Sequence, residues 1–430
     1  MQFFSTQRSS PQVGFREAVI NSLPADKGLY FPVAIPRFSY DKISALESAG
    51  LPELGFEIMR PYTQDVFSDT TLETIVQEAF NFEIPLVQVE AGIFSLELFH
   101  GPTYAFKDVG ARFLARCLGE FAKSESRETT ILVATSGDTG GAVANGFFNV
   151  EGVRVVILYP SGKVSDLQEK QLTTLGGNIT ALEVEGDFDD CQALVKQAFL
   201  DAELSKKLNL TSANSINIAR WMPQSIYYAS LALQMKNAAE ALIAVPSGNY
   251  GNVTAGMLAK RMGFPLGKFL VCSNANDVVP RYLESCEYEV LPTVATYANA
   301  MDVSNPSNFP RMLELYDHSF DDLIQEVSGF TLHDKHILET IEQCHKETGY
   351  VLDPHGAIAY AGLKKKLKID QKGVFLETAH PIKFRPVMEK ALRDKMPMPG
   401  FAKDLMLKQK SSIKMSNEYA DFKNLLKRTS

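Results

Sequence analysis

The chain has 430 residues, of which 45% are hydrophobic and 22% are charged. These values are close to globular averages and exclude a wholly disordered or fibrous protein, and the length predicts two or three domains of roughly 150 residues. The net charge of −8, without recurring blocks of Lys and Arg, argues against nucleic acid or an anionic membrane as the main partner. A small molecule is therefore the expected ligand.

The sequence carries no targeting, membrane or metal signal that we recognise. Residues 1–30 contain no apolar segment after a basic start, and no run of about 18 apolar residues occurs, so a cytoplasmic location is expected. The five cysteines are scattered and odd in number, which predicts reduced thiols. His333 and His336 are not accompanied by an H-E-x-x-H motif or a Cys/His cluster, so no metal site is expected.

Residues 1–90 show no repeated alternation of strands and helices, and we expect them to form a separate N-terminal module. A turn is predicted at 26–32. Asp69 or Thr70 can cap an apolar-periodic helix that runs to Phe80. From about Pro85 the pattern changes to strand, turn and helix, which marks the start of a different architecture.

A lysine in the segment 100–112 has an unusual setting, because glycine, proline and aromatic residues surround it. Residues 94–99 alternate like a strand and 109–121 have helical spacing, so Lys107 is expected in the first turn of a helix. The positive end of the helix dipole should lower the pKa of its amine. A less protonated amine suits a Schiff base with an aldehyde, of which pyridoxal phosphate is the commonest. Alternatively, Lys107 is a solvated lysine paired with Asp108.

Strands alternate with helices through most of the remaining chain. The expected strands are 130–135, 153–159, 179–184, 241–246, 269–272 and 374–378, and the expected helices are 142–148, 164–175, 188–200, 219–239 and 253–262. This alternation predicts βαβ units and parallel sheets that are covered on both faces.

The fold class that we expect is α/β, with two open, twisted, mostly parallel sheets and helices on both faces. The first lobe should cover 91–220 and the second 221–430, after an N-terminal α+β module at 1–90. The second lobe includes a tail in which apolar residues at three-to-four spacing predict a docked terminal helix. These residues are Tyr419, Phe422, Leu425 and Leu426.

Two glycine loops follow predicted strands, at 136–140 and 247–252. Open α/β sheets bind ligands at the carboxyl ends of their strands, and a glycine loop at a helix N-terminus can hold a phosphate. Each loop alone is weak support, because ordinary αβ turns also use glycine and asparagine. Neither loop is a P-loop, and no G-x-G-x-x-G is present. Together with Lys107 they predict two phosphates, one from a coenzyme and one from a substrate.

Several motifs in a fixed order resemble the threonine synthase family, whose members are pyridoxal-phosphate enzymes of the tryptophan-synthase β fold type. The similar segments are His100-Gly101-Pro102-Thr103, Phe106-Lys107-Asp108, the loops at 134–140 and 246–252, and Glu377-Thr378-Ala379-His380-Pro381. Ser5-Thr6-Gln7-Arg8, the segment 28–32 and the tail at 417–423 are also similar. The resemblance therefore covers essentially the whole chain.

The resemblance implies a role for several residues around the cofactor. Lys107 would form the Schiff base, and Thr378 would face the pyridine nitrogen, although a threonine is also ordinary in a strand. Asp138 would lie beside the ring hydroxyl, where more distant relatives often have asparagine. The loop around the cofactor phosphate would consist of Ser247, Gly248, Asn249, Tyr250, Gly251 and Asn252.

The resemblance also implies a reaction, in which O-phospho-L-homoserine and water give L-threonine and phosphate by γ-elimination and β-hydration. This is the last step of threonine biosynthesis and the work of a carbon–oxygen lyase. From the second anion site we expect Ser136, Thr139 and Arg112 to hold the substrate phosphate and Thr135 to contact the substrate, and no obligate protein partner is expected. A serine or threonine dehydratase, which needs no second phosphate site, and a catalytically silent binding protein are the alternatives.

Overall fold

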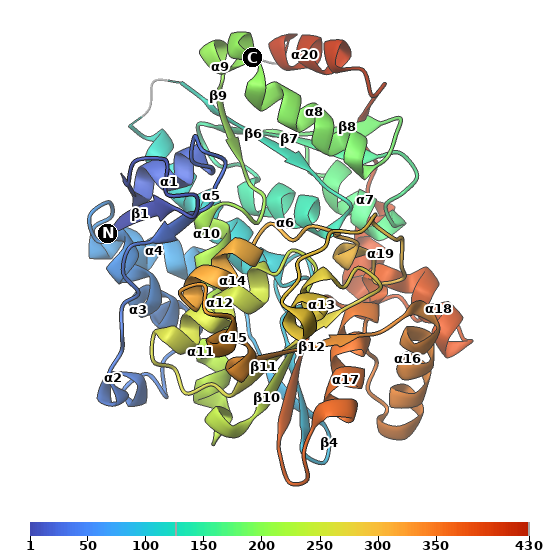
Figure 1. The fold of residues 1–430 in the computed structure, drawn as a ribbon. Coiled ribbons are helices and arrows are strands. Elements are labelled where there is room, and N and C mark those ends of the chain that lie inside the picture. The colour runs from blue at the N-terminus through green and yellow to red at the C-terminus, as the bar shows by residue number, and fades with distance from the viewer. Residues whose placement is uncertain (125–126, 429–430) are drawn as a thin grey trace.

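The computed structural model describes residues 1–124 and 127–428, in which two open sheets are flanked by helices (Figure 1). A third, small antiparallel sheet lies near the N-terminus with the order β2-β1-β3. Its strands are β1 (Gln2–Ser5), β2 (Val13–Gly14) and β3 (Tyr30–Pro32), and the helices of this region are α1 (Phe15–Asn21), α2 (Tyr40–Ser44), α3 (Leu51–Thr63) and α4 (Asp69–Ala79).

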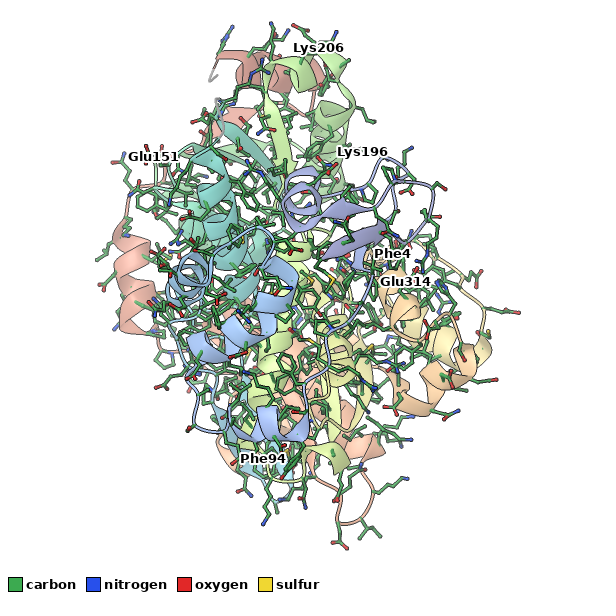
Figure 2. The ribbon with its side chains drawn as sticks, turned by 90° about the vertical axis from the view of Figure 1, so that its left-hand side faces the viewer. Phe4, Phe94, Glu151, Lys196, Lys206 and Glu314 are labelled. Atoms are coloured by element: carbon green, nitrogen blue, oxygen red, sulfur yellow. The ribbon has the colours of Figure 1, made fainter. Side chains whose placement is uncertain are left out.

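The N-terminal module does not have a core of its own. Phe3 and Phe15 belong to the same apolar cluster as Phe113 and Trp221 from later parts of the chain. At the surface, Arg8 lies over the ring of Phe4 at 3.7 Å and pairs with Glu314 at 2.6 Å, and Figure 2 shows Phe4 and Glu314 close together. The module is thus packed into the rest of the protein.

The five-stranded sheet is parallel throughout, with the order β14-β8-β7-β6-β9. All eight residues of its central strand β7 are buried, as expected for a sheet covered on both faces. The strands are β6 (Thr129–Ala134), β7 (Val153–Pro160), β8 (Ile179–Val184), β9 (Asn209–Ser212) and β14 (Ile413–Met415). Its helices are α5 (Lys107–Ala122), α6 (Asp138–Phe147), α7 (Asp166–Thr173), α8 (Phe188–Leu200), α9 (Ala202–Lys207) and α20 (Tyr419–Arg428).

The six-stranded sheet has the order β12-β11-β10-β13-β5-β4 and is parallel except for the edge strand β4. The strands are β4 (Leu86–Glu90), β5 (Ile93–Glu97), β10 (Leu242–Pro246), β11 (Lys268–Ser273), β12 (Val327–Thr331) and β13 (Gly373–Glu377). Its helices are α12 (Gly251–Arg261), α13 (Val278–Ser285), α14 (Phe309–Leu315), α15 (Phe320–Glu326), α16 (Asp334–Thr348), α17 (Pro354–Lys366) and α18 (Arg385–Leu392), while α19 (Gly400–Leu407) packs against α7. No helix in the described part of the chain is both long and apolar enough to span a membrane.

The α/β class with mostly parallel sheets is confirmed, but the sheets do not follow the expected lobe boundaries. Strand β5, which comes just before Lys107, pairs with β13 in the six-stranded sheet. Strand β14 of the tail pairs with β8 in the other sheet, and the predicted terminal helix α20 buries Phe422 and Leu426 beside α8. Because β14 adds an edge strand to β8, the tail belongs with the first lobe (Figure 1).

The long helix expected at 219–239 is interrupted. It consists of α10 (Ile218–Trp221), a 3₁₀ turn at Met222–Gln224 and α11 (Ser225–Gln234), and a further 3₁₀ turn follows at Ala238–Glu240. Pro223 lies in the first turn, and proline lacks the N–H that a continuous helix needs. The prediction of one helix was therefore wrong at this residue.

Helices α5 and α10 contact each other through a glycine. A Cβ atom at Gly110 would lie 2.4 Å from the backbone oxygen of Arg220, and backbone atoms cannot move aside without shifting the whole helix. The close approach holds Arg220 at a fixed place relative to Lys107, three residues before Gly110 on the same helix. A side chain at 110 would disturb that arrangement.

We expect Gly110→Ala to lower the free energy of unfolding by about 1–3 kcal/mol, because the added methyl group overpacks this contact. Gly119→Ala in the same helix is the matched control, since its Cβ would meet only a Val150 methyl group at 3.0 Å. Alanine also favours the helical state, so the control should change stability by less than about 1 kcal/mol. Urea denaturation of both variants checks this, and equal losses would contradict the close-contact explanation.

Candidate functional site

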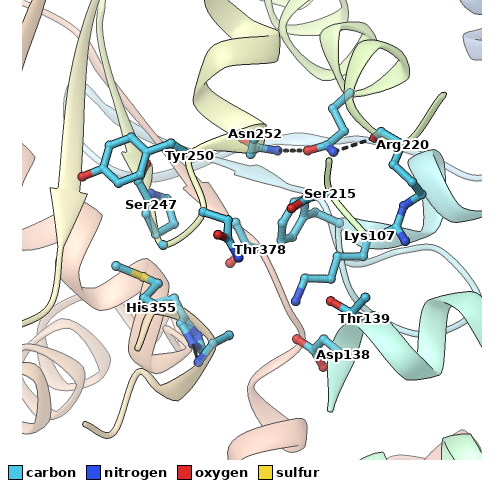
Figure 3. A pocket seen from close by; sticks show the side chains of 18 residues that line it. Lys107, Asp138, Thr139, Ser215, Arg220, Ser247, Tyr250, Asn252, His355 and Thr378 are labelled. Atoms are coloured by element: carbon cyan, nitrogen blue, oxygen red, sulfur yellow. Dashed lines mark hydrogen bonds between the residues drawn. The ribbon is translucent and has the colours of Figure 1, made fainter. Parts of the chain in front are cut away.

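One pocket lies between the two sheets, at the carboxyl ends of β10 and β13 and beside the N-terminus of α6 (Figure 3). This is the place where open α/β sheets bind their ligands. The residues that line it are Phe106, Lys107, Asp138, Thr139, Ser215, Arg220, Gln224, Pro246, Ser247, Gly248, Asn249, Tyr250, Gly251, Asn252, Ala300, Met301, His355 and Thr378. The Lys107 segment and the loop at 247–252 thus meet in one cavity.

Lys107 is the first residue of α5, as the sequence predicts. The turn before it is fixed to the segment after β13, because the Phe106 N–H donates to the Thr378 carbonyl at 2.8 Å. The hydroxyl of Tyr227 donates to the carbonyl of Phe106. The Lys107 side chain therefore extends into the pocket from a turn that these hydrogen bonds hold in place.

Burial lowers the pKa of the Lys107 amine to about 8. The charge of Asp138 acts in the opposite direction, while the positive charges of Arg220 and Lys383 lower the pKa further. The expected direction is thus confirmed, but the main cause is desolvation of the amine rather than the helix N-terminus. The uncharged fraction of the amine near neutral pH is therefore much larger than that of an ordinary lysine.

Asp138 is the first residue of α6 and lies in the pocket wall near Lys107 (Figure 3). Its carboxylate accepts from Gln168 Nε2 at 2.8 Å and pairs with Lys383 Nζ at 2.8 Å. Burial raises the pKa of Asp138, but the charges of Lys383 and Lys107 outweigh burial and hold it well below its usual range. Asp138 is consequently an anion.

The loop at 247–252 presents its backbone to the pocket, because several of its side chains bind elsewhere. Ser247 donates to Val245 O at 2.9 Å, and the Tyr250 hydroxyl lies 2.8 Å from Ser273 Oγ. Figure 3 shows the Tyr250 ring directed away from Lys107. The loop leads into α12, whose first residue is Gly251. Free N–H groups at a helix N-terminus favour a bound anion.

Gly248 leaves room in this loop for the chain segment that crosses the pocket. A Cβ atom at Gly248 would lie 2.8 Å from Met301 Cα and 3.0 Å from Ala300 O. Both are backbone atoms, so a larger residue would displace the segment. The glycine therefore allows the loop and this segment to approach each other closely.

The loop at 135–140 differs in part from its expected role. Thr139 lines the pocket, but Thr135 and Ser136 are not among the lining residues. The buried Thr135 hydroxyl accepts from the N–H groups of Gly137 at 3.0 Å and Gly140 at 2.9 Å. Thr135 thus supports the loop rather than a ligand.

Arg112 does not reach the pocket, which corrects the expected substrate contact. Its guanidinium donates to the carbonyls of Glu78 and Ala79 at the end of α4 and to Asn81 Oδ1 at 2.9 Å. The last carbonyls of a helix lack partners and attract cations. Five residues on a helix correspond to a rotation of about 140° beyond a full turn, so Arg112 faces away from the side of α5 that carries Lys107.

Arg220 is a cation in the pocket that the sequence analysis did not identify. Its side chain is 2% exposed and donates to Ala213 O, while its buried Nε has no hydrogen-bond partner among the described residues. Burial lowers the pKa of Arg220 to about 10. A charged residue within the apolar 218–234 segment was the signal that could have revealed it.

His355 is a second pocket residue that the sequence analysis missed. Its Nδ1 lies 2.6 Å from Asp353 Oδ1, and Asp353 caps α17 through the N–H groups of His355 and Gly356. The Ala300 N–H approaches His355 Nε2 at 3.3 Å. A histidine two residues after a capping aspartate gives no pattern that distinguishes it from an ordinary helix start.

Comparison with known proteins identifies relatives over the full length of the chain. The family model described as "Pyridoxal-phosphate dependent enzyme" matches residues 73–378, and those described as "Threonine synthase N terminus" and "Threonine synthase, C-terminal" match 2–80 and 356–426. The threonine synthase of Haemophilus influenzae is 44% identical over 99% of both chains.

Solved structures agree with these matches. The crystal structure of threonine synthase from Escherichia coli superposes with a TM-score of 0.93 at 40% identity and covers 100% of both chains. The structure of "PLP bound Threonine synthase" from Brucella melitensis has a TM-score of 0.94 at 35% identity and covers 100% of this chain and 99% of that chain.

We expect Thr135→Val to destabilise the protein by about 2 kcal/mol or more, because two buried N–H groups lose their acceptor. Thr135→Ser keeps the hydroxyl and should lose only about 1 kcal/mol for the removed methyl group. Thermal or urea unfolding of both variants measures the difference. Equal effects of valine and serine would show that the methyl packing, and not the hydroxyl, matters at this position.

Proposed function

Because the chain belongs to the threonine synthase family of pyridoxal-phosphate-dependent enzymes, we propose that the pocket around Lys107 is its active site. The chain is a carbon–oxygen lyase of threonine biosynthesis. It converts O-phospho-L-homoserine and water into L-threonine and phosphate by γ-elimination and β-hydration. The proposal requires no nucleic acid, membrane or obligate protein partner.

The observation that carries the proposal is a buried amine of lowered pKa in the same pocket as a glycine-shaped helix N-terminus. These features fit the aldehyde and the phosphate of pyridoxal phosphate. Lys107 would attach to the aldehyde, and the loop formed by Ser247, Gly248, Asn249, Tyr250, Gly251 and Asn252 would hold the phosphate. Thr378 would face the pyridine nitrogen and Asp138 the ring hydroxyl.

When bound, the cofactor supplies an electron sink that stabilises negative charge at the substrate carbons. Lys107 would remove and return protons as a general base and acid, for which its pKa of about 8 is well placed. The hydroxyl of Thr378 is neutral and cannot keep the pyridine nitrogen protonated as a carboxylate would. Other groups around the site must therefore stabilise more of the negative charge than they would beside a protonated pyridine nitrogen.

Arg220 replaces Arg112 as the proposed contact for the substrate phosphate. The support is its burial in the pocket wall, its free Nε, and the presence of Ser215 and Thr139 among the lining residues. A phosphate monoester carries nearly two negative charges near pH 7, and a guanidinium binds such a group with paired hydrogen bonds. The two anion sites expected from the sequence would then be the loop at 247–252 and the side of the pocket near Arg220.

The reaction is tested by measuring phosphate and threonine released from O-phosphohomoserine in the same sample. The native chain should release equal amounts, and Lys107→Ala should abolish both. Lys123→Ala is the control, because this lysine follows the end of α5 and its side chain is 71% exposed. Keto acid and ammonia without phosphate would indicate a dehydratase, and a colourless purified protein would indicate a silent binding protein.

The phosphate contact is tested by comparing Arg220→Lys with Arg112→Met. The lysine keeps the charge but loses the forked donors, so KM for O-phosphohomoserine should rise about tenfold or more. Arg112→Met should leave KM unchanged. Competitive inhibition by inorganic phosphate should weaken in parallel for Arg220→Lys only, and the reverse pattern in the two variants would overturn the assignment.

A further inference from the structure

A second lysine near the pocket is completely buried. Lys383 belongs to the 3₁₀ turn Pro381–Phe384, which follows β13, and its side chain is 0% exposed. Its ammonium donates to Thr103 O at 2.7 Å and pairs with Asp138 Oδ1 at 2.8 Å. It does not line the pocket, so it acts on a ligand only through other residues.

A buried charge of this kind requires a specific compensation, since an unpaired ammonium in a protein interior costs several kcal/mol. Asp138 provides it, and Asp138 is in turn held in place by Gln168 Nε2 at 2.8 Å. Lys383 and Asp138 therefore form a net neutral pair whose negative member faces the pocket. Lys107 lies near that carboxylate in the wall of the same pocket (Figure 3).

The pair changes the electrostatics that Lys107 experiences. Without Lys383, the anion of Asp138 would have Lys107 as its nearest cation, and an ion pair would keep the amine protonated. Lys383 offsets part of the charge of Asp138, and the positive charges of Lys383 and Arg220 both oppose protonation of Lys107. Burial, the largest influence on the amine, is then opposed only by the partly offset charge of Asp138.

We propose that Lys383 is a positioning residue, whose role is to be the permanent counter-ion of Asp138 and thereby favour the uncharged, reactive form of the Lys107 amine. The inference rests on the proposed role of Lys107. It assigns a task to a residue that does not line the pocket. The task depends on the charge of Lys383 and not only on its packing.

Burial moves the pKa values of several groups near the two lysines. Burial lowers the pKa of His380 to about 4, raises that of Tyr227 well above its ordinary value, and lowers that of Arg220 to about 10. The charged and titratable groups that face this region are Asp108, Asp138, Arg220, Tyr227, His355 and His380. Asp108 is buried, and Thr103 donates to it through its N–H and its hydroxyl.

The test is a pH titration of the visible absorbance of the cofactor-loaded enzyme, which follows protonation of the Lys107 nitrogen in its linkage to the aldehyde. Lys383→Met keeps the length of the side chain but removes the charge, so the titration midpoint should move to higher pH by about one to two units. Lys383→Arg retains the charge and should move it by less than about half a unit. The acid limb of the kcat profile should shift with the absorbance.

A double variant separates electrostatics from packing. Asp138→Asn combined with Lys383→Met removes both charges, so its midpoint should return toward that of the native enzyme. A purely structural role predicts lower melting temperatures for Lys383→Met and the double variant, with unchanged midpoints, and that result would overturn the inference. If the native protein holds no cofactor, the proposed function fails instead, which distinguishes the two outcomes.

Discussion

The structure depends on one electrostatic constraint, which is that an amine must be buried without an ion pair of its own. Desolvation lowers the pKa of Lys107 to about 8, and this works only if nearby anions are balanced by other cations. The neighbouring carboxylate of Asp138 is balanced by Lys383. The packing of α5 against α10 at Gly110 fixes Arg220 as a further positive charge beside the same cavity.

The topology brings these groups together from distant parts of the chain. The turn that carries Lys107 follows strand β5 of the six-stranded sheet. Helix α5, which begins at Lys107, packs against α6 in the layer over the five-stranded sheet. The Ala105 and Ala379 backbones pair directly, which ties the turn to the segment after β13. Lys107 therefore lies at the junction between the two sheets, in the wall of the pocket.

Local sequence patterns predicted the α/β class, most strands, the helix start at Lys107 and the loop at 247–252, because each depends on neighbouring residues. The prediction that Arg112 binds the substrate was wrong because the sequence does not show which face of α5 meets the pocket. Arg220, His355 and Lys383 lie more than 100 residues from Lys107, and only the folded chain brings them near it. The sequence contains the cause of the helix interruption, which is Pro223, but the helical pattern on both sides of this proline favours one continuous helix.

The most direct test of the account is to identify the lysine that carries the cofactor. The loaded enzyme would be reduced with borohydride, digested and analysed by mass spectrometry. The account predicts the added mass of the reduced cofactor on the peptide that contains Lys107 and on no other. Modification of Lys383, the other buried lysine beside Asp138, or the absence of any modified peptide would contradict it.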